Sequence, residues 1–164
     1  MNEVTTFVGI VSDTGPLISW ARAGHIGLLR DLVEKLVLPQ SVVQELQKPG
    51  RPGSQLLSEI WITEGERLPE QALVGFPSVL GNGEKQAIAL AQRLEVMLLV
   101  DDSSARKEAE RRGIICLSTL RLLAQAKQEG KLNEVAPLLQ AFRNEGFWLS
   151  DSVARLFLAR LGEA

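Results

Sequence analysis

Two continuous apolar runs constrain the fold of this chain more than any other feature. The runs FVGIV (7–11) and VMLLV (96–100) are each followed within two residues by aspartate, at Asp13 and at Asp101 and Asp102. An unbroken apolar run of this length is typical of a strand that is buried on both faces, as in a parallel sheet. The sequence therefore predicts two central strands, each with carboxylates at its exit.

The segments around these runs alternate between strand-like and helix-like spacing. Further short strands are predicted at 35–39, 60–62 and 114–117, and the stretch 64–82 reads as irregular. Helices are predicted within 17–34 (two short ones), at 39–48, 83–94 and 101–113, and through 118–164 with interruptions at Gly130, Pro137 and Gly146. Such alternation predicts an α/β fold, a three-layer α/β/α sandwich around a mostly parallel sheet.

Length and composition limit the classes of protein to which the chain can belong. With 164 residues we expect one domain, 1–164, on which the C-terminal helical segment 131–164 packs. The net charge of −2 argues against a globally basic nucleic-acid-binding protein but leaves room for a local basic patch. One Cys and one His exclude a Cys/His zinc cluster. The lone Cys, an acidic start and the lack of a membrane-length apolar run lead us to expect a cytoplasmic protein.

Five acidic residues suggest where chemistry could occur. Asp13, Asp101 and Asp102 follow the two central strands, and ligands of open parallel sheets bind beyond the carboxyl ends of such strands. Helical spacing puts Glu84 on the apolar face of 83–94 and Glu45 at the margin of the apolar face of 39–48. Clustered carboxylates repel one another unless a cation accompanies them. Oxygen ligands without His or Cys suit Mg²⁺ or Mn²⁺.

Each acid also has an ordinary structural explanation. Asp13 could cap the helix that follows it, and Asp102 could cap the next helix and pair with Arg106. Glu84 could be a first-turn acid favoured by the helix dipole, and Glu45 a half-exposed surface residue. Taken together, however, acids at two strand exits and two inward helix positions favour a common site over five coincidences.

Other residues with chemical potential are predicted to be structural. Trp61, Trp148 and Phe147 are expected to pack in the interior rather than to form a base-stacking platform. His25 is expected in a loop or cap, and Cys116 as an inert thiol within a strand. The sequence contains no complete dinucleotide-binding, P-loop or serine-hydrolase motif.

Several segments in a specific order resemble the PIN domain, the metal-dependent nuclease fold of VapC-type toxin ribonucleases, and most closely a short prokaryotic PIN-like branch. The segments that carry the resemblance are IVSDTGPLISW (10–20), LPQSVVQEL (38–46), LGNGEKQAIALA (80–91), LLVDDSSARKEAERRGI (98–114), STLRLLAQAKQEGKL (118–132) and GFWLSDSVARLFLARLGE (146–163). They cover nearly the whole chain.

The resemblance implies a set of site residues. The first-strand acid is Asp13, the helix glutamate is Glu45, the third acid is Glu84 and the fourth is Asp101. The third position is Glu where many toxins have Asp, and the fourth reads Asp-Asp. Whether Asp101 or Asp102 is the principal ligand is therefore open, although Asp101 is nearer the strand end.

The resulting hypothesis is a Mg²⁺-dependent endoribonuclease, with Mn²⁺ as the alternative ion, acting as the toxin of a type II toxin–antitoxin pair. The metal would be held by Asp13, Glu84, Asp101 and Asp102, with Glu45 as a direct or water-mediated ligand. The substrate-binding candidates at the strand exits and on the following helix are Thr14, Ser118, Thr119 and Arg106. The partners expected are RNA and a cognate antitoxin protein.

Two other classes of function remain as alternatives. One is a PIN-like module that binds nucleic acid or protein with weak or no catalysis. The other is a phosphoacceptor receiver domain, which needs a lysine just after a late strand, and IICLSTL (114–120) contains none.

A homodimer is also expected, through helices of the first third or of the C-terminal segment. The last helix carries Val153, Leu156, Phe157, Leu158 and Leu161, an apolar arc that is broad for packing on one sheet face. The alternative is that this helix closes the domain's own core. PIN toxins commonly pair, and this part of the resemblance favours the dimer.

Overall fold

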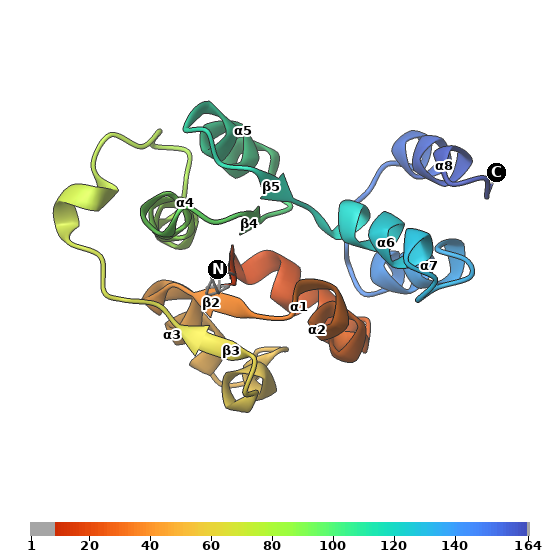
Figure 1. Ribbon diagram of the computed structural model, residues 1–164, viewed down its shortest axis with the longest axis horizontal. Helices are drawn as coiled ribbons and strands as arrows, with labels where there is room; N and C mark the ends of the chain where they lie inside the picture. The colour runs from red at the N-terminus through yellow and green to blue at the C-terminus, as the bar shows by residue number, and fades with distance from the viewer. Residues whose placement is uncertain (1–8, 164) are drawn as a thin grey trace, which may run out of the picture.

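A parallel sheet forms the centre of the protein in the computed structural model, which describes residues 9–163 (Figure 1). Within that range the sheet has five strands, in the order β3-β2-β1-β4-β5, and every neighbouring pair is parallel. The strands are β1 (Ile10–Ser12), β2 (Leu36–Leu38), β3 (Ile62–Glu64), β4 (Leu98–Leu99) and β5 (Cys116–Leu117). The predicted α/β architecture is confirmed.

The direction in which strands are added to the sheet reverses between β1 and β4. The chain first builds outward from β1 through β2 to β3, and then returns to place β4 on the other side of β1. Val11 pairs with Leu98 and Ser12 with Leu99. The backbone N–H of Asp13 extends this ladder by donating to the carbonyl of Leu99 at 3.1 Å. A reversal of this kind opens a crevice at the carboxyl ends of the two strands.

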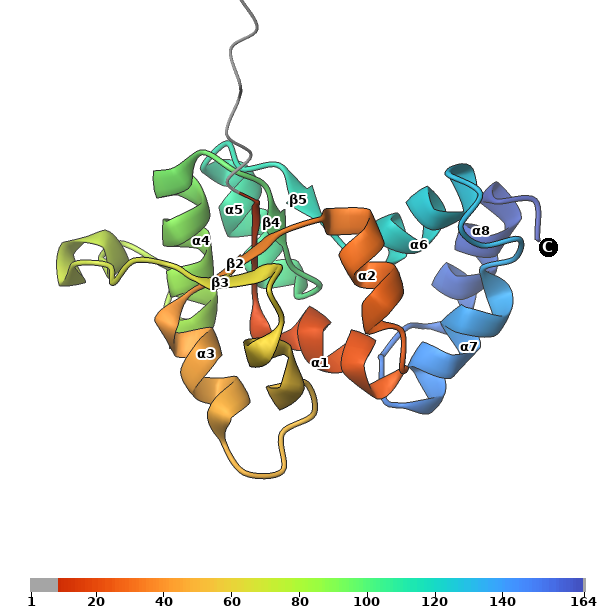
Figure 2. The ribbon, with the colours of Figure 1, turned by 60° about the horizontal axis from the view of Figure 1, so that its bottom comes forward.

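Side chains alternate between the two faces of each strand and so divide the core in two. Leu36 and Leu38 belong to one buried cluster, and Val37 between them belongs to the other. The first cluster is covered by α1 (Thr14–Arg22), α2 (Ile26–Val33) and α3 (Gln40–Gln47), and the second by α4 (Asn82–Leu94) and α5 (Ser103–Arg111). Figure 2 shows α4 and α5 on one side of the strands and α1 and α2 on the other.

Three further helices lie together at one end of the molecule (Figures 1 and 2). They are α6 (Thr119–Gln128), α7 (Ala136–Asn144) and α8 (Asp151–Arg160). Phe142 of α7 packs edge-to-face on the buried Trp20 of α1, with ring centroids 5.0 Å apart. Glu163 follows α8 in the chain. Its carboxylate accepts hydrogen bonds from the backbone N–H groups of Val135 and Ala136 and forms an ion pair with Lys127 at 2.8 Å. These contacts fasten the C-terminal helices to α1 and to one another.

The element boundaries differ from the sequence prediction by a few residues. The central strand predicted at 7–11 is observed as Ile10–Ser12, and residues 7 and 8 lie outside the described range. The small strand predicted at 60–62 is observed at Ile62–Glu64, where it gains β2 as a partner. Pro137 lies in the first turn of α7 rather than interrupting a helix, because its fixed φ and missing N–H suit a first turn. Turns of 3₁₀ helix occur at Ser54–Ser58 and Glu70–Leu73.

None of the helices in residues 9–163 combines the length and the apolar character that crossing a membrane would require.

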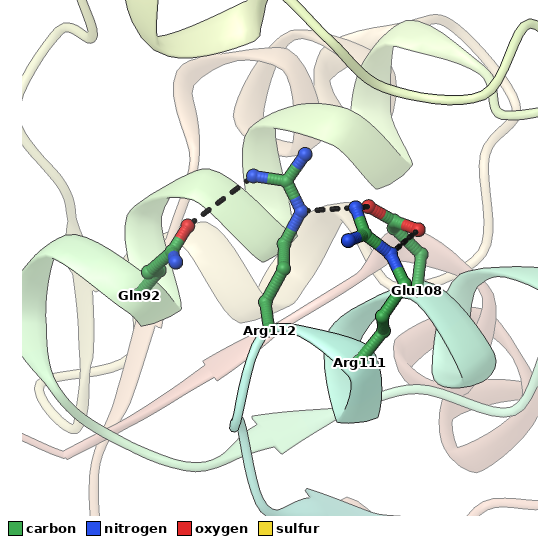
Figure 3. Close-up of polar contacts among 4 residues, drawn as sticks. All are labelled: Gln92, Glu108, Arg111 and Arg112. Atoms are coloured by element: carbon green, nitrogen blue, oxygen red, sulfur yellow. Dashed lines mark hydrogen bonds and ion pairs between the residues drawn. The ribbon is translucent and has the colours of Figure 1, made fainter.

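Glu108 of α5 is a buried carboxylate that holds Arg112, and Arg112 in turn contacts two other segments of the chain. It accepts hydrogen bonds from the guanidinium groups of Arg111 and Arg112, and Arg112 also donates to Gln92 of α4 at 3.3 Å (Figure 3). The Arg112 guanidinium also lies over the ring of Phe76, 3.8 Å from its centroid, in the irregular segment 64–82. The hydrogen bonds from Arg111 and then Arg112 lower the pKa of Glu108 from 4.5 to about 2.

We expect Glu108→Gln to lower the melting temperature at neutral pH. Because the folded pKa lies below the unfolded value, ionised Glu108 stabilises the protein above about pH 4.5, and this stabilisation is lost as the pH falls toward 2. The difference between the parent and the variant should therefore narrow in acid. Thermal unfolding at neutral pH and in acid measures this difference. The control is Glu110→Gln, at an exposed residue of the same helix. Equal melting temperatures at neutral pH would contradict this role.

Candidate functional site

Asp13 lies where β1 ends and α1 begins, at the point where the strand order reverses. Its carboxyl is largely buried, and burial is the main cause that raises its pKa from 3.8 to about 6. The backbone N–H of Thr14 opposes this rise. The negative charges of Glu84, Asp102 and Asp101 add to it, in that order. The ionised form of Asp13 is thus costly unless a cation approaches.

Asp101 follows β4 and is held by the start of α6. One carboxylate oxygen accepts the backbone N–H of Thr119 at 2.7 Å, and the other accepts its hydroxyl at 2.6 Å. Burial raises the pKa of Asp101, although these two hydrogen bonds and the nearby Arg106 lower it. Thr119 was predicted to contact substrate, but its side chain is fully buried. Thr119 fixes the orientation of the Asp101 carboxylate.

Glu84 and Asp102 are both close enough to Asp13 to affect its pKa, and each also caps a helix. Glu84 accepts the backbone N–H of Gly81 at 3.3 Å and so caps its own helix, α4. Asp102 accepts the N–H of Ala105 at 2.9 Å and caps α5. Burial raises the pKa of Glu84, the Gly81 hydrogen bond lowers it and the charge of Asp102 raises it. The capping role that the sequence allowed for Asp102 is confirmed, and it leaves one oxygen of Asp102 free of that bond.

Glu45 of α3 is held by two cations. Its carboxylate oxygens lie 2.8 Å from Lys48 Nζ and 2.5 Å from a guanidinium nitrogen of Arg51. The hydrogen bond from Lys48 is the main cause that lowers the pKa of Glu45, and Arg51 adds to it. Glu45 is therefore ionised, half-buried and locally neutralised, in contrast to Asp13.

All five predicted acids line one open cavity of about 700 Å³, which we call the acidic cavity. The wall also includes Thr14, Gly15, Pro16, Ile18, Ser41, Gln44, Lys48, Gly81, Asn82 and Gly83. Within residues 9–163, no three acid, His or Cys side chains are close enough together to form a ready metal site. The chemistry of the donor set nevertheless fits a hard divalent cation, which would offset the cost of ionised Asp13.

The sequence analysis missed Ser41 as a residue of this site. In the described part of the chain its buried hydroxyl has no hydrogen-bond partner, while its backbone N–H donates to Gln86 at 3.1 Å. A Cβ added at Gly83 would lie 3.9 Å from both Ser41 Oγ and Asp13 Oδ1, so the two oxygens border the same small space. Ser41 lies within the segment LPQSVVQEL, but a serine in the first turn of a helix gives no signal of its own.

The remaining substrate-binding candidates divide between two cavities. Thr14 lines the acidic cavity. Arg106 and Ser118 line a second cavity of about 560 Å³, which shares Asp101 and Asp102 with the first. Ser118 Oγ accepts the backbone N–H of Arg121 and so caps α6.

One prediction about the aromatic residues is wrong. Trp61 is buried, and Phe147 packs edge-to-face on Phe142, but Trp148 is 85% exposed rather than packed in the interior.

His25 is at the start of α2, where its ring forms a hydrogen bond with the carbonyl of Ala23, as the sequence predicts for a cap residue. Cys116 is half-buried, and burial raises the pKa of its thiol, as expected of an unreactive cysteine.

Comparisons with known proteins agree with this architecture. The family model described as DUF3368, PIN domain, matches residues 9–163. Among solved structures, a PilT N-terminus domain protein from the hyperthermophilic archaeon Sulfolobus solfataricus P2 is similar, with a TM-score of 0.54 and 18% identity. That match covers 71% of this chain and 92% of the archaeal chain, and at this identity it supports the fold alone. A search of curated proteins finds no significant match.

We expect Asp13→Asn to stabilise the metal-free protein at neutral pH by about 1–2 kcal/mol, since each pKa unit corresponds to about 1.4 kcal/mol and water reaches the cavity. The folded pKa of about 6 exceeds the unfolded 3.8, so stability falls as the pH rises between these values. The gain should shrink at about pH 5. Urea unfolding in chelator at both pH values measures it, with the exposed Asp31→Asn of α2 as the control. A destabilised variant would contradict the cost assigned to ionised Asp13.

Proposed function

This chain belongs to the PIN-domain family, and from that membership we propose that it is a divalent-metal-dependent endoribonuclease. PIN domains are generally nucleases and commonly metal-dependent. The finer part of the proposal is that the ion is Mg²⁺, or Mn²⁺ in its place, and that the substrate is RNA.

The observation that carries the proposal is the environment of Asp13. Its carboxyl is buried at the carboxyl end of a central strand, and three further acids raise its pKa. An arrangement that raises the free energy of its own ionised form has little structural value, because a neutral side chain would pack there at lower cost. Perturbed carboxyls that line an open cavity are typical of a functional site.

The chain's own residues would share the work of the site. Asp13, Glu84, Asp101 and Asp102 would hold the ion, and Glu45 would contribute directly or through water. The bound ion would supply an activated water and offset the charge of the phosphodiester. Thr119 keeps the Asp101 carboxylate oriented through two hydrogen bonds. Thr14 and Ser41, which both line the acidic cavity, would donate to substrate phosphate or to the water shell of the ion.

The acidic cavity must change its charge before it can accept RNA. Four acids in one region repel a phosphate backbone, so metal binding would precede substrate binding. Lys48 and Arg51, which neutralise Glu45 at the rim, reduce this repulsion on the α3 side. Metal concentration would in this way control access of RNA to the site.

The biological role we propose is that of the toxin of a type II toxin–antitoxin pair, with a cognate antitoxin protein as partner. The alternative within the same family is a binding module with weak or no catalysis. The two differ in one measurable property, the cleavage of RNA. Membership of the PIN-domain family sets aside the receiver-domain alternative.

We expect Asp13→Asn and Asp101→Asn each to reduce cleavage of a labelled RNA in Mg²⁺ by about 100-fold or more, because each removes a charged ligand for the ion. Chelation of divalent ions should abolish cleavage by the parent, and Mn²⁺ should restore it. Asp31→Asn serves as the control, since its exposed carboxyl lies on α2 outside the acidic cavity. Undiminished cleavage by Asp13→Asn would remove Asp13 from the mechanism. A parent that binds RNA without cleaving it would favour the binding module.

We also propose a homodimer that buries the outer face of α8. Phe157, Leu158 and Leu161 pack against the chain's own core, whereas Val153 and Leu156 are 45% and 55% exposed on the same helix. Light scattering should give twice the 18.0 kDa mass of the chain, and Leu156→Lys should reduce it to one chain. Val79→Lys, at an exposed apolar position in the segment 64–82, is the matched control. A parent found only at 18.0 kDa would contradict the dimer.

A further inference from the structure

Trp148 borders a cavity that continues from the acidic cavity. The wall of this second cavity, which we call the aromatic cavity, includes Phe147, Trp148 and Leu149 together with Asp101 and Asp102. The two aspartates line both cavities, so the spaces meet at the proposed metal ligands. A polymer held at the acids could extend directly along the face of Trp148.

The segment that carries Trp148 is anchored on both sides. The backbone N–H of Phe147 donates to the carbonyl of Phe142 at 3.0 Å, and the two rings pack edge-to-face with centroids 5.8 Å apart. On the other side, Arg143 donates to the carbonyl of Leu149 at 3.0 Å. The indole is therefore presented to solvent by a fixed backbone, with little conformational entropy left to lose on binding.

The polar groups of the aromatic cavity match a phosphate. Within residues 9–163, the half-buried Arg106 side chain forms no hydrogen bond or ion pair. Ser118 Oγ accepts the N–H of Arg121 at 3.1 Å, which leaves the hydroxyl hydrogen of Ser118 available to donate. A guanidinium and a hydroxyl beside an exposed aromatic face are the groups with which proteins bind single-stranded nucleic acid.

We propose that Trp148 is a base-stacking platform for the RNA substrate. An unpaired nucleobase stacks on the indole, while Arg106 and Ser118 bind the adjoining phosphate. This inference rests on the proposed function, because it treats the acids at the junction of the cavities as the cleavage site. It adds a preference for single strands, since the bases of a duplex are already stacked on one another and cannot also stack on the indole. It adds little sequence preference, because every base has a face that can stack.

A protein partner is the competing occupant of this surface. The chemistry of the aromatic cavity favours RNA, because its wall combines apolar side chains, which suit the face of a base, with Arg106 and serine hydroxyls, which suit a phosphate. On α8, Val153 borders the aromatic cavity, whereas the exposed Leu156 lies outside it, on the surface that we assign to a second copy of the chain.

Binding is best measured without turnover, in the parent protein with Ca²⁺ in place of Mg²⁺, because Ca²⁺ also binds carboxylates and offsets the charge of the acids, which are all left intact. The probe is a fluorescently labelled single-stranded oligoribonucleotide of about 12 nucleotides, compared with its duplex. We expect Trp148→Ala to weaken single-strand binding about tenfold and to leave duplex binding unchanged, and Trp148→Phe to restore most of the loss. Ile60→Ala, at a 99% exposed apolar residue just before the opposite edge strand, should have no effect.

Tryptophan fluorescence gives a second readout that a purely structural role would not produce. Trp20 and Trp61 are buried, so quenching of the emission by unlabelled RNA should come from Trp148 and disappear in Trp148→Phe. Equal single-strand affinity of Trp148→Ala and its parent would overturn this inference while leaving the proposed nuclease intact. Failure of the parent to bind or cleave any RNA would overturn both. A change of particle mass in Trp148→Ala by light scattering would make the indole a subunit contact and overturn the stacking role.

Discussion

The pairing of β1 with β4 is the interaction on which the rest of the structure depends. This pairing places β4 beside the central strand β1 after the chain has built β2 and β3. The N–H of Asp13 extends the ladder by donating to the carbonyl of Leu99. Without this pairing, the acids after the two strands would belong to separate edges. With it, Asp13 and Asp101 enter one cavity together with Glu84 from α4 and Glu45 from α3. The site is thus a direct consequence of strand order.

The acids of this cavity differ in how the fold treats their charge. Asp101 is oriented by two hydrogen bonds from Thr119, Glu45 is neutralised by two cations, and Asp102 is bound to a helix start. Asp13 is the most perturbed, with burial and neighbouring charges raising its pKa to about 6. Structural and functional explanations therefore coexist at the same residues. A helix cap occupies one oxygen of a carboxylate and leaves the other for a ligand.

Two exposed apolar side chains near the C-terminus, Trp148 and Leu156, are assigned different partners. Trp148 is fixed by Phe147 and Leu149 and borders the cavity that continues from Asp101. Leu156 lies further along the chain on α8 and is exposed, as is Val153, whereas Phe157, Leu158 and Leu161 of this segment pack on the core. An exposed indole beside a guanidinium and an exposed aliphatic stripe favour different partners, because stacking requires an aromatic face and helix pairing requires only apolar area.

The sequence by itself determined the strands, the helices and the acids at their ends. Apolar runs that end in aspartate signal buried strands with exposed exits, and helical spacing places Glu84 and Glu45 inward. Only the tertiary structure decided what each side chain meets. Thr119 became a buried partner of Asp101, Ser41 joined the cavity, and Trp148 was left in solvent. The physical reason is that strand and helix periods are local properties of the chain, whereas burial and charge neighbours arise from segments far apart in sequence that meet across the sheet.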